Sequence, residues 1–286
     1  MRLFPKLSTN RHRPLSPGNA VAAFAVCAVA GLVLAAVVAA LAVDCGLGMD
    51  AVFALSSIIA FGVPGLVVRP LAVGRIKAGS FSVPLLLSVV ILAFVCQPVV
   101  QWASAVDYSC YTRIWGDNAS TARQNAELIL SVCHFDSIGG FLLTTLVVAA
   151  LPALCEELLF RGALVPIVRR LTGGWVSAVV ISAVVFSLVH ADMTGFLART
   201  VLGVLMGAVF VITRSIWSSV AFHFTNNFAV VYNLYLADDK LSLLTSPTEM
   251  PFVLVTLASL ALSVGMVFSI YLHVSRRRSS HLAGSN

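Results

Sequence analysis

The sequence predicts an all-α membrane protein, a polytopic helix bundle of about eight transmembrane helices with both termini cytoplasmic. The first observation is composition, because 59% of the 286 residues are hydrophobic and only 10% are charged, whereas soluble domains are about a quarter charged. The second is that the apolar residues form long runs without strand-like alternation, which favours helices over a β-barrel. The third is the position of the basic residues between these runs, which orients the chain.

The apolar runs are long enough to be membrane spans, each of which needs about 20 apolar residues. The eight runs cover residues 19–43, 51–68, 80–105, 138–171, 174–190, 196–213, 216–236 and 251–274. The first run is longer than the apolar core of a signal peptide, so we expect a retained span. The fourth run is long, and we expect it to project into the cytosol and to turn at residues 172–174, whose Thr-Gly-Gly sequence stops helices.

The charge map supports this count of spans. With the N-terminus inside, the basic residues fall mainly on the inner side, as the positive-inside rule requires. They are Arg2, Lys6, Arg11, Arg13, Arg69, Arg75, Lys77, Arg161, Arg169, Arg170, Arg214 and residues 276–278. Every acidic residue except Glu156 and Glu157 falls outside, and Arg199 falls inside the sixth run. The net charge of +6 therefore indicates membrane orientation and no nucleic-acid partner. We expect a multi-pass protein of the cell membrane, and specifically of a bacterial plasma membrane.

We divide the chain into three parts. Residues 1–137 hold three predicted spans and an outer loop, residues 138–236 hold the polar clusters described next, and residues 237–286 hold an outer loop, the last span and a basic cytoplasmic tail. Cys110 and Cys133 both fall in the first outer loop. They form a disulfide in an oxidising compartment or remain free thiols, and the sequence leaves both alternatives open.

Three clusters of polar residues lie inside predicted spans, at residues 156–161, 186–190 and 223–227. Ionisable side chains are costly in a membrane, and their usual explanation is functional. Glu156 lies as far before the turn at residues 172–174 as His190 lies after it, so a rise of about 1.5 Å per residue places both at the same depth. The spacing therefore predicts a carboxylate facing an imidazole across an antiparallel helix pair.

Spacing also predicts two pairs of side chains on single helices. Glu157 and Arg161 are four residues apart, as are His223 and Asn227, so each pair shares a helix face. Ion pairs such as Glu157–Arg161 are more often structural than catalytic. One inconsistency remains, because counting from Arg214 makes His223 shallower than His190 when all helices are straight. A kink at Pro166 or a tilted span would remove it.

These residue types suit hydrolysis of an amide bond. A carboxylate beside a neutral histidine can deprotonate a water molecule, and a second histidine with an amide can donate hydrogen bonds to a developing oxyanion. Glu156, His190 and His223 are also common ligands for zinc, in which case the metal would activate the water. A transporter is an alternative, because Glu156 and His190 can form a proton relay.

The three clusters together resemble the CAAX-protease and bacteriocin-processing family of intramembrane proteases, called CPBP or Abi. The family pattern is Glu-Glu-x-x-x-Arg, then Phe-x-x-x-His, then His-x-x-x-Asn. The matching residues are Glu156, Glu157, Arg161, Phe186, His190, His223 and Asn227. The resemblance covers about a third of the chain and makes residues 138–236 the catalytic core.

The resemblance implies a role for each matching residue. Glu156 and His190 would activate water, and His223 and Asn227 would stabilise the oxyanion. Glu157 would belong to the catalytic set with support from Arg161 and Phe186. The family is labelled a metalloprotease, yet a metal-free glutamate mechanism is argued for its relatives. The cofactor is therefore a divalent metal such as zinc, held by Glu156, His190 and His223, or none.

The function that follows is an intramembrane endopeptidase. It would cleave a membrane-associated protein or peptide near the cytoplasmic face of the bilayer through a water activated by glutamate and histidine. The alternative is a non-proteolytic protein, either a bacteriocin-immunity or regulatory factor or a proton-coupled transporter. A transporter would be expected to show inverted repeats, which this sequence lacks. The substrate and any need for a prenyl group stay open.

Overall fold

The structure, a computed structural model, describes residues 14–73, 82–116, 119–245 and 251–283. Within these ranges it contains helices and no strand, and most of the described residues in each of the eight predicted apolar runs are helical. Six helices are long and apolar enough to cross a membrane: Pro17–Asp44, Met49–Ala72, Val83–Trp115, Ile138–Thr172, Met193–Thr213 and Val253–Arg276. Trp175–Leu188 is a shorter apolar helix, and Ile216–Leu236 carries the third polar cluster. The prediction of a polytopic helical membrane bundle is confirmed.

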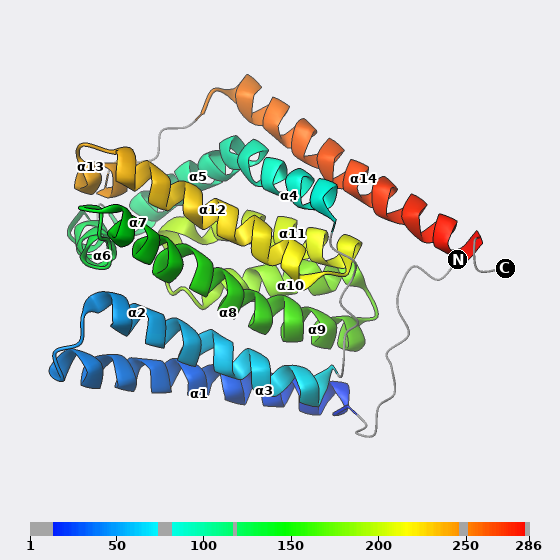
Figure 1. Ribbon diagram of the computed structural model, residues 1–286, viewed down its shortest axis with the longest axis horizontal. Coiled ribbons are helices and arrows are strands. Elements are labelled where there is room, and N and C mark those ends of the chain that lie inside the picture. The colour runs from blue at the N-terminus through cyan, green and yellow to red at the C-terminus, as the bar shows by residue number, and fades with distance from the viewer. Residues whose placement is uncertain (1–13, 74–81, 117–118, 246–250, 284–286) are drawn as a thin grey trace.

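The helices run back and forth along one direction (Figure 1). Their bounds are α1 Pro17–Asp44, α2 Met49–Ser57, α3 Val63–Ala72, α4 Val83–Val95, α5 Gln97–Trp115, α6 Ala119–Ser131, α7 Ile138–Thr144, α8 Leu151–Leu159, α9 Val165–Thr172, α10 Trp175–Leu188, α11 Phe196–Thr213, α12 Ile216–Leu236, α13 Lys240–Thr245 and α14 Val253–Ala283. Helices α1–α3 form one layer beside α7–α9, and α14 lies along α4 and α5 on the opposite side. The division into three parts stays a prediction.

The two ends of the bundle differ in charge. The end where α9 turns into α10 and where α11 turns into α12 carries, among the described residues, the basic side chains of Arg69, Arg169, Arg170, Arg214 and Arg276. We call it the inner end, because the positive-inside rule predicts that an end rich in basic residues faces the cytoplasm. The outer end carries α6, α13 and most acids. The predicted inner residues at positions 2–13, Arg75 and Lys77, and 277–278 lie outside the part whose side chains are described.

In the part of the chain that the structure describes, three π-helical segments interrupt the spans: η1 Ile58–Gly62, η2 Thr145–Ala150 and η3 Phe160–Leu164. Each one ends two residues before a proline, namely Pro64, Pro152 or Pro166. A proline has no N–H to donate, and its ring clashes with the carbonyl four residues earlier, so the wider π turn accommodates it. The kink expected at Pro166 is therefore a local widening of the helix. Segments of this kind occur frequently at functional sites, and η2 and η3 flank the predicted catalytic glutamates.

The layer of α1–α3 is fastened to the rest of the bundle at the inner end. The guanidinium of Arg170 in α9 donates hydrogen bonds to the carbonyls of Ala72 and Leu15, the latter at 2.7 Å. Nearby, α3 approaches α8 so closely that a Cβ atom at Gly65 would lie 2.8 Å from the backbone nitrogen of Leu159. Glycine is therefore required at this contact.

The six cysteines are all described by the structure, and all six are free thiols. Cys110 is exposed and Cys133 is partly buried by the hairpin between α6 and α7. Of the two alternatives left open by the sequence, the structure has free thiols. Burial raises the pKa of the Cys133 thiol above its ordinary value, which lowers its reactivity.

Candidate functional site

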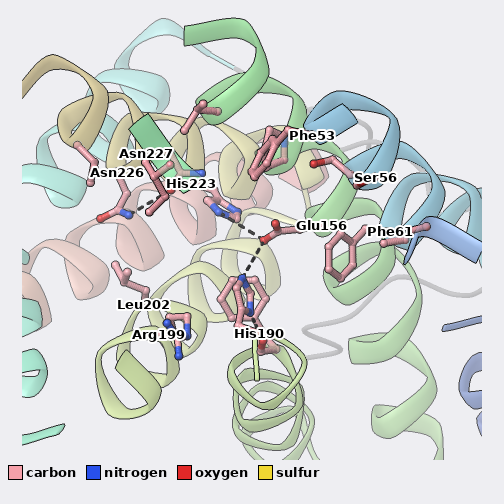
Figure 2. Close-up of a pocket in the computed structure, with 18 of the residues that line it drawn as sticks. Phe53, Ser56, Phe61, Glu156, His190, Arg199, Leu202, His223, Asn226 and Asn227 are labelled. Atoms are coloured by element: carbon pink, nitrogen blue, oxygen red, sulfur yellow. Dashed lines mark hydrogen bonds and ion pairs between the residues drawn. The ribbon is translucent and has the colours of Figure 1, made fainter. Parts of the chain in front are cut away.

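Three side chains from three separate helices converge at the middle of the bundle. Glu156 lies on α8, His190 follows the last turn of α10, and His223 lies on α12. Glu156 Oε2 lies 4.0 Å from His190 Nε2 and 3.7 Å from His223 Nε2, and Figure 2 shows both imidazoles pointing toward the carboxylate. The structure thus brings Glu156 and His190 to the same depth, as their equal spacing from the turn predicts.

His223 reaches this depth because α12 starts below the end of the bundle. The turn before it is covered by other helices, since Thr213 and Ser215 are only 4% and 1% exposed. The Cδ1 atom of Ile216 lies 3.5 Å from the position that a Cβ of Gly162 would occupy. His223 is seven residues beyond Ile216, and Glu156 is six residues before Gly162. The two side chains therefore meet, and the inconsistency in the sequence-based count came from placing the start of α12 at the membrane surface.

Glu157 has an environment opposite to that of its neighbour. It is fully buried at 0% exposure, and its Oε1 accepts hydrogen bonds from Arg161 Nη1 at 2.7 Å and from His223 Nδ1 at 3.0 Å. The hydroxyl of Ser219 donates to Oε2 of the same carboxylate. The second arm of Arg161 donates to the carbonyl of Gly203 at 2.9 Å. The predicted Glu157–Arg161 pair is present, and Glu157 also fixes the orientation of His223 through its Nδ1 atom.

Phe186 orients the other histidine. Its carbonyl accepts a hydrogen bond from His190 Nδ1 at 2.7 Å, so that nitrogen carries a proton and Nε2 faces Glu156. The ring of Phe186 lies 4.9 Å from the imidazole of His190 and 5.9 Å from that of His223, measured between ring centroids. The guanidinium carbon of Arg161 lies 5.1 Å from the same ring centroid. The Phe-x-x-x-His spacing thus places the carbonyl four residues before the imidazole that it orients.

Glu156 is the carboxylate of this cluster that lacks a hydrogen-bond partner. Its side chain is 9% exposed, and its buried Oε2 atom has no hydrogen-bond partner among the described residues. The separations of 3.7 and 4.0 Å from the two imidazole nitrogens exceed hydrogen-bond length. An unsatisfied buried carboxylate oxygen costs free energy, and such atoms call for a functional explanation.

A chain of amides leads from α5 to Asn227. Gln97 Nε2 donates to Asn226 Oδ1 at 3.0 Å, and Asn226 Nδ2 donates to Asn227 Oδ1 at 3.4 Å. Asn227 lines the same cavity as Glu156 and His223. Because its oxygen accepts from Asn226, its own NH₂ group is left to donate. The sequence pattern pointed to Asn227, but nothing in it indicated that Gln97, 129 residues before Asn226, orients the amide.

The cluster lies at the inner limit of a cavity of about 680 Å³. Apart from the cluster, side chains of α1, α2, η1, α11 and α12 line it, most of them apolar. Ile129 of α6 and Leu244 of α13 also line it, and both helices lie at the outer end (Figure 1). The cavity thus extends from Glu156 toward the outer end, and the expectation of cleavage near the cytoplasmic face stays a prediction.

Arg199 and Asp192 form an ion pair at the outer end of this cavity. Arg199 Nη1 lies 3.0 Å from Asp192 Oδ2, and Arg199 is one of the lining residues. Burial raises the pKa of the Asp192 carboxyl, but hydrogen bonds from Thr194 and Arg199 outweigh burial, so the pKa lies below its ordinary value. Asp192 thus binds Thr194 of its own loop and Arg199 of α11.

Glu156, His190 and His223 are the residues expected to hold a divalent metal. Within the described residues, no group of three or more His, Cys, Asp or Glu side chains is arranged to hold a metal ion. The Nδ1 atom of His223 donates a hydrogen bond to Glu157. Hydrogen bonds of this kind orient both metal-binding and catalytic histidines. The cofactor expected from the sequence, a divalent metal or none, therefore stays a prediction.

Comparison with known proteins adds a finding for the middle of the chain. Residues 138–229 match the family model described as Rce1-like, type II CAAX prenyl endopeptidase. The match begins with α7 and ends within α12, so it contains all seven residues of the three motifs: Glu156, Glu157, Arg161, Phe186, His190, His223 and Asn227. No curated protein and no solved structure matches this chain.

Proposed function

Residues 138–229 of this chain belong to the Rce1-like endopeptidases, and hence to the CPBP family that the motifs resemble, and from this premise we propose that the protein hydrolyses a peptide bond within the membrane. The observation that carries the proposal is the unpartnered, buried Oε2 of Glu156 between two imidazoles in an apolar cavity. A buried carboxylate without a hydrogen-bond partner destabilises a membrane protein, so a functional role is its usual explanation.

The first step is activation of a water molecule. A water between Glu156 Oε2 and His190 Nε2 can donate one hydrogen to each acceptor, since Nδ1 of His190 already carries its proton. Glu156 takes the proton as the water oxygen attacks the carbonyl carbon of the peptide. The new C–O bond converts the carbonyl into a tetrahedral oxyanion. General-base assistance of this kind contributes about 10²- to 10⁴-fold.

The second step is stabilisation of that oxyanion, and the charges of the cluster support His223 as the donor. Glu156 and Glu157 carry two negative charges and Arg161 carries one positive charge. A protonated His223 makes the buried cluster neutral, and its Nδ1–H then faces Glu157 while its Nε2–H points into the cavity. The amide of Asn227 supplies another donor. Each oxyanion donor contributes about 10²- to 10³-fold.

In the last step the C–N bond breaks. Protonated Glu156 returns its proton to the leaving nitrogen, which departs as an amine, and the carbonyl reforms as a carboxylic acid. Glu157 and Arg161 act through His223, because Glu157 orients its Nδ1 and balances its charge. These residues position the catalytic group and do not touch the substrate.

The packing also bears on the transporter alternative. A proton relay needs a path from Glu156 to both membrane faces. On the inner side the chain beyond the cluster is solidly packed, with Phe160, Ala163 and Ile167 all at 0% exposure. The observations therefore favour hydrolysis at a site that is open on one side.

The proposal is tested by cleavage in reconstituted vesicles. Purified wild-type protein is incubated with a library of apolar membrane peptides, and new N-termini are identified by mass spectrometry. We expect cleavage by the wild type and none by Glu156→Ala. Equal cleavage by both proteins would refute the mechanism. Metal content of the same purified protein, measured by mass spectrometry, with cleavage before and after chelation, decides whether a divalent ion shares the site.

A further inference from the structure

The cavity that contains Glu156 extends from the cluster toward the outer end of the bundle. Its lining residues on α1 are Leu32, Ala35, Ala36 and Ala39, which share one face and continue toward the outer end of that helix. On α12 the lining continues in the same direction from His223 to Leu234. Ile129 and Leu244 complete it from α6 and α13, the two short helices that lie at the outer end in Figure 1.

A second cavity extends the first toward the outer surface. It has a volume of about 440 Å³ and is lined by α1, α2 and α6. The two cavities share Ala39, Phe53 and Ser56, and Figure 2 shows Phe53 and Ser56 beside Glu156 on the side of α2. The space between the α1–α3 layer and the rest of the bundle therefore continues from the cluster to the region under α6.

The opposite direction is closed by packed side chains. Between the cluster and the inner end lie Phe160 and Phe222 at 0% exposure and Leu159 at 1%. The layer of α1–α3 is also fastened there by Arg170 and by the close approach at Gly65. A polypeptide therefore has no route to Glu156 from the inner end.

The charged residues at the two ends of the bundle indicate which membrane face the open side of the cavity points toward. The described basic residues of the inner end, such as Arg69, Arg169 and Arg214, face the cytoplasm by the positive-inside rule, whereas Asp44, Asp238 and other acids gather at the outer end. The open direction of the cavity is thus the non-cytoplasmic one. Its lining of Ala, Leu, Val, Ile and Phe side chains favours an apolar occupant.

We propose that this site takes its substrate from the non-cytoplasmic half of the membrane, as an extended apolar segment of a membrane polypeptide lying between the α1–α3 layer and α12. The nature of the substrate as a peptide rests on the proposed function, but the side of access does not. An unwound segment is required because a helix keeps its amide carbonyls hydrogen-bonded along its own axis, where water cannot attack them freely.

The test uses isosteric cysteine probes in the full chain. Cys45, Cys110 and Cys133 are first replaced by serine to remove the exposed and half-buried thiols of the outer end. Ser56→Cys then places a thiol in the cavity, and Ser82→Cys, at the start of α4, places a matched one at the inner end. Right-side-out and inside-out vesicles are treated with a membrane-impermeant maleimide, and the mass of the protein is measured.

We expect Ser56→Cys to gain one label only in right-side-out vesicles and Ser82→Cys only in inside-out vesicles. Labelling of Ser56→Cys only from the cytoplasmic side, or from neither side, would overturn the side of access. The same labelling in a Glu156→Gln background needs no activity, so it separates this inference from the proposed function. In active protein, labelled Ser56→Cys should lose cleavage of its peptide. Undiminished cleavage would show that the substrate does not occupy this cavity.

Discussion

The inner and outer halves of the bundle differ in how tightly they are packed, and the adjacent residues Glu157 and Glu156 differ in their hydrogen bonds. In the inner half the core is solid, and Glu157, buried completely, has partners on both oxygens in Arg161, His223 and Ser219. In the outer half the protein is hollow, and Glu156 ends in an oxygen without a partner. The two adjacent carboxylates thus differ, because Glu157 is fixed by hydrogen bonds whereas Glu156, the general base of the proposed function, is not.

From this difference between the two halves, we expect the largest loss of activity when Glu156 is replaced. Glu156→Gln should lower the cleavage rate by about 10²- to 10⁴-fold, because the general base is lost, and should change thermal stability little, because Oε2 of Glu156 makes no hydrogen bond that the substitution would remove. Rates on a membrane peptide and thermal unfolding in detergent check both. Glu127→Gln, an exposed outer acid, is the control. A variant that unfolds with its loss of activity would contradict the division of roles.

Glu157 should behave in the opposite way. Replacing it with leucine leaves Arg161 buried without its partner, and removing one member of a buried ion pair costs about 3 to 5 kcal/mol. We therefore expect a large decrease in the unfolding temperature in detergent, together with loss of activity. The double variant Glu157→Leu with Arg161→Met should recover part of that stability but no activity. Full stability in the single variant would show that the pair is not structural.

A smaller effect is expected from the amide chain. Gln97→Leu removes one hydrogen bond from Asn226, worth about 1 kcal/mol, so the orientation of Asn227 loosens and kcat falls by about fivefold. KM should not change, because Gln97 does not line the cavity. Gln101→Leu, one turn further along α5 and exposed, is the matched control. An equal loss in both variants would assign the effect to α5 as a whole.

The smallest effect concerns Asp192. Its pKa lies below the ordinary value in the folded protein, so its contribution to stability is complete above about pH 4, the ordinary pKa of Asp, and is lost as the pH falls through the folded value. Asp192→Asn should cost about 0.5 kcal/mol or less, because its side chain is 37% exposed and solvent screens the pair. Thermal unfolding should show the difference at pH 7 and its disappearance in acid. Asp136→Asn should show no difference at either pH.

The sequence predicted what depends on local spacing. The equal distances of Glu156 and His190 from the turn at residues 172–174, and the four-residue spacing of Glu157 and Arg161, follow from the geometry of a single helix or hairpin. The eight apolar runs are mostly helical for the same reason. These predictions use no information about how distant helices pack.

What the sequence did not reveal depends on that packing. Ser219 lies 62 residues from Glu157, and Gly203 lies 42 residues from Arg161. The start of α12 lies below the end of the bundle, where Ile216 packs close to Gly162 on a helix 54 residues earlier in the chain. A hydropathy pattern locates a span but not its depth, so the meeting of His223 with Glu156 needed the three-dimensional structure.

The attachment of the α1–α3 layer has a consequence for how the chain tolerates substitution. Arg170 binds this layer through the backbone carbonyls of Leu15 and Ala72, and every amino acid supplies a carbonyl. The two receiving positions can therefore vary in side chain and keep the contact, whereas Arg170 has no equivalent replacement, since lysine lacks a planar fork that reaches two acceptors at once. At this contact, substitution is therefore tolerated at positions 15 and 72 but not at Arg170. Arg170 lies on α9, which ends the span that also contains Glu156.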